Sequence, residues 1–325
     1  MKKAFVFCLA LGMLMTVAPL TLADAPSVAI VAAGALGDRS FYDSAYGGLE
    51  RLQEELGVSG AVIECKEDAS LYEQSLISAS EAADIVVAVG WQFWEPLEMI
   101  APELPESKFI FVDNALDYID NVFAITYAEN EGSFLVGYIA ATLSQTGVIG
   151  AVGGEDNETI NNFLIGYRQG AAYANPDVRV EITYTADYEN PTKGKEHALA
   201  LFDLGADIIF QVAGKTGEGV IEAAAETGNF AIGVDSDQKY INPEAIICSM
   251  IKEVGNSIYD VVAAYAADGT FPGGTVWNAD MEGGFISVGY GDDTMTQQVP
   301  DELKAEVQAL AQEIIAGEIV VATTR

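Results

Sequence analysis

Two short segments of the sequence hold residues that could bind an aromatic, hydroxylated small molecule. The apolar run 207–213 contains Phe210 and leads into a turn at Gly214, and the run 230–234 is followed by Asp235. A phenylalanine offers a flat apolar face, and a carboxylate accepts hydrogen bonds from hydroxyl groups. A helical stretch separates the two runs, so both strand ends can open onto one crevice at the carboxyl edge of a sheet, where open α/β proteins bind ligands.

A turn near the N-terminus could supply the opposite wall. Residues 34–43 follow an apolar run, contain two glycines, and place Asp38 and Ser40 before a helical stretch that begins near Phe41. A helix cap followed by a packing aromatic would also explain this pattern. Because Phe41 and Tyr42 stand together beside a strand end, we favour a ligand-binding face.

The sequence lacks the residues of most catalytic and metal sites. Gly214-Lys215-Thr216 resembles the end of a phosphate-binding loop, but Ile209 stands where that loop needs a glycine. A single histidine, His197, and no Gly-x-Ser-x-Gly motif argue against a catalytic triad. Cys65 and Cys248 are too few for a zinc site and lie in apolar runs, so buried free thiols are favoured over a disulfide. We expect neither an enzyme nor a cofactor.

The N-terminal residues predict a signal peptide, residues 1–25. Lys2 and Lys3 precede the uncharged apolar stretch 4–23, and Ala23-Asp24-Ala25 places small residues where a signal peptidase cleaves. An uncleaved membrane anchor is the alternative. We expect a mature protein that starts near Pro26 and is periplasmic or secreted and soluble.

The charge of the chain narrows the choice of partners. The net charge is −34, and removal of the predicted signal peptide leaves 13 basic and 48 acidic side chains, a net charge of −35. A field of this sign repels nucleic acids and anionic membranes. The strand ends also lack a cluster of Arg and Lys that could neutralise phosphate. We therefore expect no nucleic-acid binding, and a nucleoside fits better than a nucleotide.

The apolar runs predict an α/β fold with two Rossmann-like, doubly wound parallel sheets. Strands are expected at 28–34, 61–65, 84–90, 109–113 and 122–127, and in a second series at 148–153, 179–185, 207–213, 230–234 and 246–250. Continuous Val, Ile and Ala runs between helical stretches are typical of parallel strands buried on both faces.

Each series of strands is expected to form one lobe. Lobe 1 would comprise residues 26–128 and about 253–280, and lobe 2 residues 129–252 and about 284–325. Three crossovers, near 128–132, 249–252 and 279–284, would form a hinge that lets the cleft close on a ligand.

Five motifs in order resemble the basic membrane protein family of ABC-transporter substrate-binding proteins, which includes purine nucleoside receptors. The motifs are Asp38-Arg39-Ser40-Phe41, Gly166-Tyr167-Arg168-Gln169-Gly170, Gly205 to Phe210 followed by Ala213 to Gly217, Ile232 to Gln238, and Ser249-Met250-Ile251-Lys252. The resemblance runs from about Val28 to the end of the chain. It implies a type I periplasmic-binding-protein fold, a purine nucleoside between the lobes, and an ABC permease as partner; we expect the protein to be a monomer.

The resemblance also assigns roles to individual residues. Phe41 and Phe210 would stack on the base from opposite lobes. Asp38 and Asp113 would face the base edge or line its pocket. The ribose would be held by three further groups, the carboxylate of Asp235, the ammonium of Lys252 and the backbone amide of Gly214.

Two features depart from the family pattern. Tyr42 stands where the family commonly has an asparagine, and a phenol cannot copy the paired donor and acceptor of an amide. Trp91, Phe93 and Trp94 make the loop after strand 84–90 bulky; they could line the ligand site or pack in the core or at its rim. Another aromatic ligand, such as a flavin or a modified nucleoside, is therefore an alternative.

Two alternatives of other classes are a nucleoside hydrolase or phosphorylase and a ligand-sensing receptor. An enzyme of this kind needs a metal-binding aspartate cluster or a phosphate site, and the sequence offers neither pattern. The receptor would signal by contact with a membrane partner.

Overall fold

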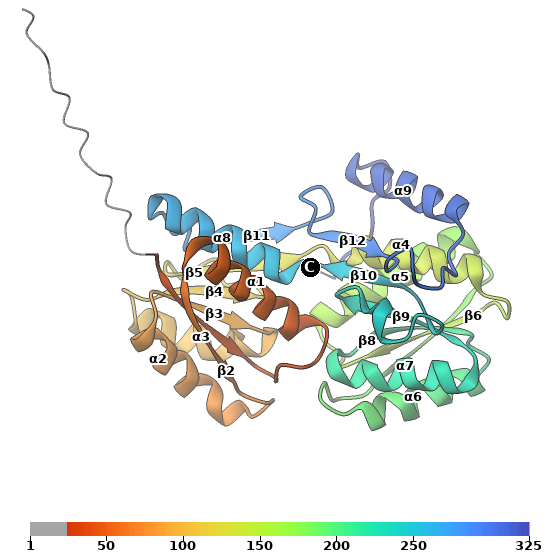
Figure 1. The fold of residues 1–325 in the computed structure, drawn as a ribbon, viewed down its shortest axis with the longest axis horizontal. Helices are drawn as coiled ribbons and strands as arrows, with labels where there is room; N and C mark the ends of the chain where they lie inside the picture. The colour runs from red at the N-terminus through yellow and green to blue at the C-terminus, as the bar shows by residue number, and fades with distance from the viewer. Residues whose placement is uncertain (1–24, 325) are drawn as a thin grey trace, which may run out of the picture.

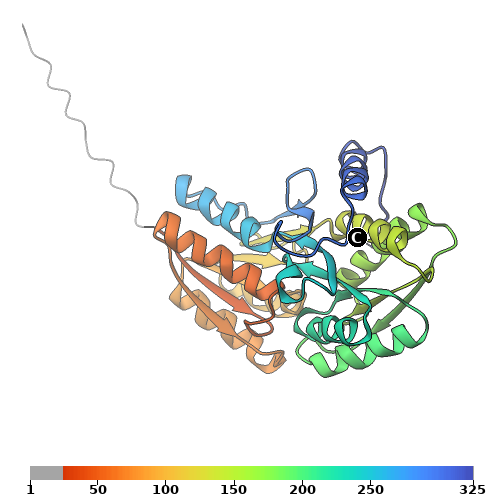
Figure 2. The same ribbon diagram turned by 45° about the vertical axis from the view of Figure 1, so that its right-hand side comes forward.

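The computed structural model describes residues 25–324, so all but the last residue of the predicted signal peptide lies outside the described part. Two α/β lobes lie side by side, each with a sheet between helices (Figure 1). The view in Figure 2 shows the helices on both faces of each sheet. The expected two-lobe α/β class is confirmed.

The sheet of the first lobe is wholly parallel, in the order β11-β5-β4-β3-β1-β2. Its strands are β1 (Ser27–Ala32), β2 (Ser59–Glu64), β3 (Ile85–Val89), β4 (Lys108–Val112), β5 (Val122–Tyr127) and β11 (Thr275–Ala279). Its helices are α1 (Phe41–Leu56), α2 (Tyr72–Ala82), α3 (Trp94–Ile100) and α8 (Val254–Asp268). The central strands are buried on both faces because helices cover both.

The second sheet has the order β12-β10-β9-β8-β6-β7 and is parallel except for β12, which runs against β10. Its strands are β6 (Val148–Gly153), β7 (Arg179–Tyr184), β8 (Ile208–Val212), β9 (Phe230–Asp235), β10 (Ile246–Lys252) and β12 (Ile286–Gly289). Its helices are α4 (Glu129–Leu143), α5 (Glu158–Ala174), α6 (Pro191–Asp203), α7 (Gly217–Thr227) and α9 (Asp301–Ile315).

The ten strands expected from the sequence are all present, within a residue or two at each end. The strands β11 and β12 were not predicted. Both lie at the edge of a sheet and β11 is largely exposed, so neither carries the continuous apolar run that marks a central strand.

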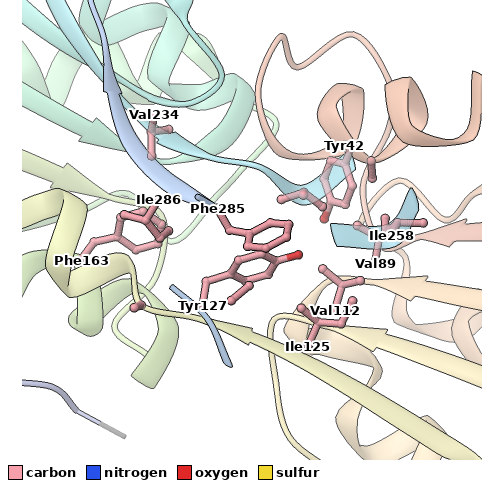
Figure 3. Close-up of a cluster of buried hydrophobic side chains, with 14 of the residues drawn as sticks. Tyr42, Val89, Val112, Ile125, Tyr127, Phe163, Val234, Ile258, Phe285 and Ile286 are labelled. Atoms are coloured by element: carbon pink, nitrogen blue, oxygen red, sulfur yellow. The ribbon is translucent and has the colours of Figure 1, made fainter. Parts of the chain in front are cut away.

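Within the described residues, the chain passes between the two sheets after β5, after β10 and between β11 and β12. The buried side chains of the two lobes meet at these passages. Figure 3 shows members of one such cluster from both lobes, among them Tyr42, Tyr127 and Phe163. The apolar core is therefore continuous beneath the cleft.

Two glycines of the 166–170 motif allow α5 to lie close against α4. A Cβ atom at Gly166 would collide with the carbonyl oxygen of Asn130, and one at Gly170 with that of Phe134. Between these glycines, Tyr167 is buried under β8. The 166–170 motif therefore positions α5, which contributes residues to the wall of a cavity between the lobes.

Candidate functional site

A cavity with about 590 Å³ of empty space, including its mouth, opens between the lobes. Its wall consists of Asp38, Phe41, Tyr42, Gly90, Trp91, Gln92, Asp113, Thr159, Ile160, Phe163, Tyr188, Glu189, Val212, Gly214, Lys215, Val234, Asp235 and Lys252. These residues come from the carboxyl ends of strands, the loops that follow them and the first turns of helices in both lobes.

The structure brings eight of the nine predicted site residues to this wall. They are Asp38, Phe41, Tyr42, Trp91, Asp113, Gly214, Asp235 and Lys252. Their position in the wall is consistent with a role in ligand binding.

Phe210 is the exception, because the structure does not bring its side chain to the cavity wall, as the expected stacking on a ligand would require. Its side chain is fully buried in β8 and packs on α5, with ring centroids 5.3 Å from Tyr167 and 6.4 Å from Phe163. All of β8 is buried, so the sequence carries no alternation that would show which face of the strand is turned to the cavity.

The aromatic residues of the second lobe that do line the cavity are Phe163 and Tyr188. Phe163 is on the first turns of α5, and Tyr188 lies between β7 and α6. Sequence reasoning missed both. The helix cap at Asn157, which accepts from the Ile160 amide at 2.9 Å, is a local signal that could have placed the start of α5 at a strand end.

Asp38 holds the first turn together. Its carboxylate accepts hydrogen bonds from the backbone amides of Ser40, Tyr42 and Asp43 at 2.9–3.0 Å. Burial raises the pKa of Asp38 to about 7, and the three amide donors oppose this rise. Asp38 thus fixes the start of α1 and so the position of Phe41 beside the cavity.

The Tyr42 hydroxyl already donates a hydrogen bond within the protein, so it is not free to donate to a ligand. Its ring is 7% exposed, lies against Gly34, and contacts Phe41 edge-on at 5.2 Å between centroids. Its hydroxyl donates to Glu67 at 3.3 Å. The phenol is therefore held by a carboxyl behind the cavity wall.

Lys252 is the central cation of the site and is 1% exposed. Its Nζ forms a short ion pair with Asp113 and lies 3.5 Å from a carboxylate oxygen of Glu129. It also lies 4.9 Å from the centre of the Phe41 ring and 5.3 Å from that of Phe163. Burial lowers the pKa of Lys252, but nearby carboxylates outweigh burial and raise it above its usual value. The lysine is therefore charged at neutral pH.

Two acids at strand ends adopt a left-handed backbone. Asp113 has φ of 83° and Asp235 has φ of 62°, a region that side-chain-bearing residues seldom occupy. Burial raises the pKa of Asp235 to about 6, while the charge of Lys252 and the Ser40 hydroxyl lower it. Such strain clusters at functional sites, and here it accompanies two buried carboxylates in the cavity wall.

Hydrogen bonds across the mouth show that the lobes are closed on each other. Ser40 Oγ donates to Asp235 Oδ2 at 2.6 Å, and Gln238 Nε2 donates to the Arg39 carbonyl at 3.1 Å. Others join Thr159 Oγ1 to the Asp113 carbonyl at 3.1 Å, and the Ala35 amide to Glu189 Oε1 at 3.1 Å. Opening the cleft would break bonds on both of its sides.

The charge of the wall is unfavourable for anions. Four carboxylates and two lysines line the cavity. One of these lysines, Lys215, lies 3.6 Å from Glu189, and the other is Lys252 among its acids. No guanidinium lines this wall. A neutral ligand with hydroxyl and N–H groups fits such a wall better than a phosphate ester.

The remaining sequence expectations concern cysteines and membrane spans. Cys65, which follows β2 in the first lobe, and Cys248, in β10 of the second, are both buried free thiols and do not pair. Within residues 25–324, no helix combines the length and the apolar character needed to cross a bilayer.

Comparisons with known proteins indicate a single protein family. A family model described as "ABC transporter substrate-binding protein PnrA-like" matches residues 25–325. Basic membrane protein A1 of Borrelia garinii subsp. bavariensis is 32% identical, over 92% of this chain and 88% of the relative. The ABC transporter nucleoside-binding protein BmpA of Lactococcus lactis subsp. cremoris is 30% identical, over 92% and 89%.

Solved structures agree. A solute-binding protein of an ABC transporter system from Aeropyrum pernix superimposes with a TM-score of 0.82 at 30% identity, over 91% of this chain and 93% of that one. A second, from Conexibacter woesei, gives 0.74 at 26% identity, over 92% and 99%.

Proposed function

Since the chain belongs to the basic membrane protein family of ABC-transporter substrate-binding proteins, we propose that it binds a purine nucleoside between its lobes and delivers it to a membrane permease. In this proposal the mature protein is exported, monomeric and without catalytic activity. The name of the Lactococcus relative as a nucleoside-binding protein supports the ligand class.

The single observation that carries the proposal is the buried Lys252 between carboxylates in a cavity walled by aromatic rings from both lobes. Aromatic faces favour a planar base, and stacking is worth about 1–3 kcal/mol per base. Phe41 comes from the first lobe, and Phe163 and Tyr188 come from the second. A base would therefore be held from two sides in the closed form.

The polar end of the cavity suits a sugar. Asp235 can accept from ribose hydroxyls and Lys252 can donate to them, while Gly214, with φ of 54°, brings its backbone to the wall. Hydrogen bonds to charged groups are worth about 1.5–3 kcal/mol each. A few such contacts together with stacking support binding in the micromolar range or tighter, after the cost of association.

Purified protein should be heated with adenosine, guanosine, inosine or their 5′-monophosphates. The proposal predicts a higher melting temperature with at least one nucleoside and little change with its monophosphate, because the wall lacks a free cation for phosphate. Equal stabilisation by both would refute the charge argument. Mass spectrometry of ligand released by denaturation would identify what the protein retains.

A different planar ligand, such as a flavin or a modified nucleoside, is favoured by one observation. Trp91 and Tyr188 add two large aromatic side chains to the wall, one from each lobe. The mass of the released ligand decides between these candidates. Free base appearing on incubation with nucleosides would instead indicate an enzyme.

A further inference from the structure

The loop that follows β3 brings an oriented side-chain amide to the cavity wall. Gln92 lines the cavity beside Trp91, and its Nε2 donates to Glu67 Oε2 at 3.2 Å. The other oxygen of Glu67 accepts from the Tyr42 hydroxyl. An ionised carboxylate only accepts hydrogen bonds, so the amide nitrogen of Gln92 must face Glu67. The amide oxygen of Gln92, Oε1, is therefore turned away from Glu67.

That oxygen has no partner among the residues that the structure describes. Gln92 Oε1 is buried and makes no hydrogen bond. It lies over Gly90, another wall residue, where an added Cβ would be only 2.6 Å away. Buried acceptors of side chains are nearly always hydrogen-bonded, so an acceptor left alone in a binding wall points to a donor on the ligand.

The neighbouring residue offers the complementary group. Trp91 Nε1 is buried and, in the described part of the chain, makes no hydrogen bond of ordinary geometry. Burial raises the pKa of the Tyr188 phenol, and hydrogen bonding by the Trp91 indole opposes this rise, so the indole N–H lies close to the Tyr188 hydroxyl across the cleft. A donor without a well-formed hydrogen bond thus stands next in sequence to an acceptor without one.

We propose that Gln92 and Trp91 determine ligand specificity by reading a ring edge that carries an N–H donor beside an acceptor. This inference rests on the proposed function and narrows its ligand class. An amino group next to a ring nitrogen, or a lactam N–H next to its carbonyl, has this pattern. Glu67 is a positioning residue, because it acts through the orientation of Gln92.

The test compares two ligands that differ at the ring edge alone. Adenosine carries an amino group, whereas unsubstituted purine riboside has the same sugar and ring system but no N–H on the base. Titration calorimetry on the full mature chain should give a dissociation constant for purine riboside about 10- to 100-fold weaker, since Gln92 Oε1 stays unpaired. Inosine, with a lactam N–H, serves as the second donor-bearing ligand.

Two variants assign the effect to residues. Gln92→Met keeps the length of the side chain without the acceptor and should weaken the better donor-bearing nucleoside by about 10- to 100-fold. It should change purine riboside less than about threefold. In Glu67→Gln the new amide can donate to Gln92, which frees Gln92 to turn its nitrogen inward, so the preference for N–H-bearing bases should shrink. A role in stability alone would leave that ratio unchanged.

Gln74→Met is the matched control, because Gln74 is exposed on α2. This variant should change neither the affinity for the donor-bearing nucleosides, nor that for purine riboside, nor the ratio between them. Wild type that binds adenosine, inosine and purine riboside equally, or a ratio unaltered in Gln92→Met, overturns the inference while the proposed function stands. Failure of wild type to bind any of these three or guanosine overturns both.

Discussion

The hydroxyl of Ser40 donates a 2.6 Å hydrogen bond to Asp235 Oδ2, joining the first turn of one lobe to the end of β9 in the other. Both residues are buried. The bond exists only when the lobes are closed, and it uses one of the carboxylate oxygens that line the cavity. Closure of the cleft and the arrangement of the cavity wall therefore both depend on the hydrogen bond between Ser40 and Asp235.

Ser40→Ala should weaken ligand binding without a comparable loss of fold stability. The variant removes a hydrogen bond to a charged group in the closed form, a contribution of about 1.5–3 kcal/mol, so the dissociation constant should rise about 10- to 100-fold. Calorimetry with the tightest nucleoside measures this change. Ser78→Ala, on the exposed face of α2, is the control. Unchanged affinity in Ser40→Ala would show that this bond does not stabilise closure.

Asp235→Asn should stabilise the ligand-free protein increasingly as pH rises. The ordinary pKa of this acid is 3.8, and burial raises it to about 6 in the fold. Between these values the folded chain binds more protons than the unfolded chain, so wild-type stability falls as pH rises through this window. Asparagine has no such titration and can still accept from Ser40. The difference in melting temperature, variant minus wild type, should therefore grow from pH 4 to pH 7.

Asp84→Asn is the control of opposite sign. Hydrogen bonds from the Ser27 amide and hydroxyl lower the pKa of Asp84, so its contribution to stability is present at neutral pH and is lost as pH falls through the folded pKa. Relative to wild type, this variant should lose stability as pH rises. Parallel trends for the two variants would contradict the assignment of the shifts.

Lys252→Met should destabilise the fold as well as abolish tight binding. It leaves the carboxylates of Asp113 and Glu129 buried without their cation, and breaking a buried pair in this way costs about 3–5 kcal/mol. Urea unfolding measures the loss. Adding Asp113→Asn should recover part of it, since one uncompensated charge is removed. Additive losses in the double variant would mean that the pair is not coupled.

Phe210→Ala and Phe41→Ala should separate stability from binding. Phe210 is fully buried against Tyr167, so its truncation should cost about 3–5 kcal/mol of unfolding free energy. Phe41 is half-buried at the cavity, so its truncation should weaken binding by about 10- to 100-fold through lost stacking. Calorimetry and urea unfolding on both variants give the comparison. A binding loss for Phe210→Ala larger than that for Phe41→Ala would restore Phe210 as a ligand contact.

The central strands of both sheets and eight residues of the cavity wall could be predicted from the sequence. Continuous apolar runs predict buried parallel strands because helices cover both faces, and residues that follow such strands must gather at one edge of a sheet. Asp235 and Gly214 were found for this reason, whereas Asp113 was assigned from the resemblance to the family. The edge strand β11 was not predicted, because its largely exposed residues form no continuous apolar run.

Which side chains face the cavity, and which contact each other, depends on the tertiary structure. Phe210 has the right type in the right segment, but a strand buried on both faces hides its direction, and the ring lies against α5. Phe163 lines the cavity because α4 and α5 pack closely. The bonds of Ser40 with Asp235 and of Gln92 with Glu67 join residues far apart in the chain or in different loops. Local patterns do not encode such contacts, since they depend on how the lobes close and the loops pack.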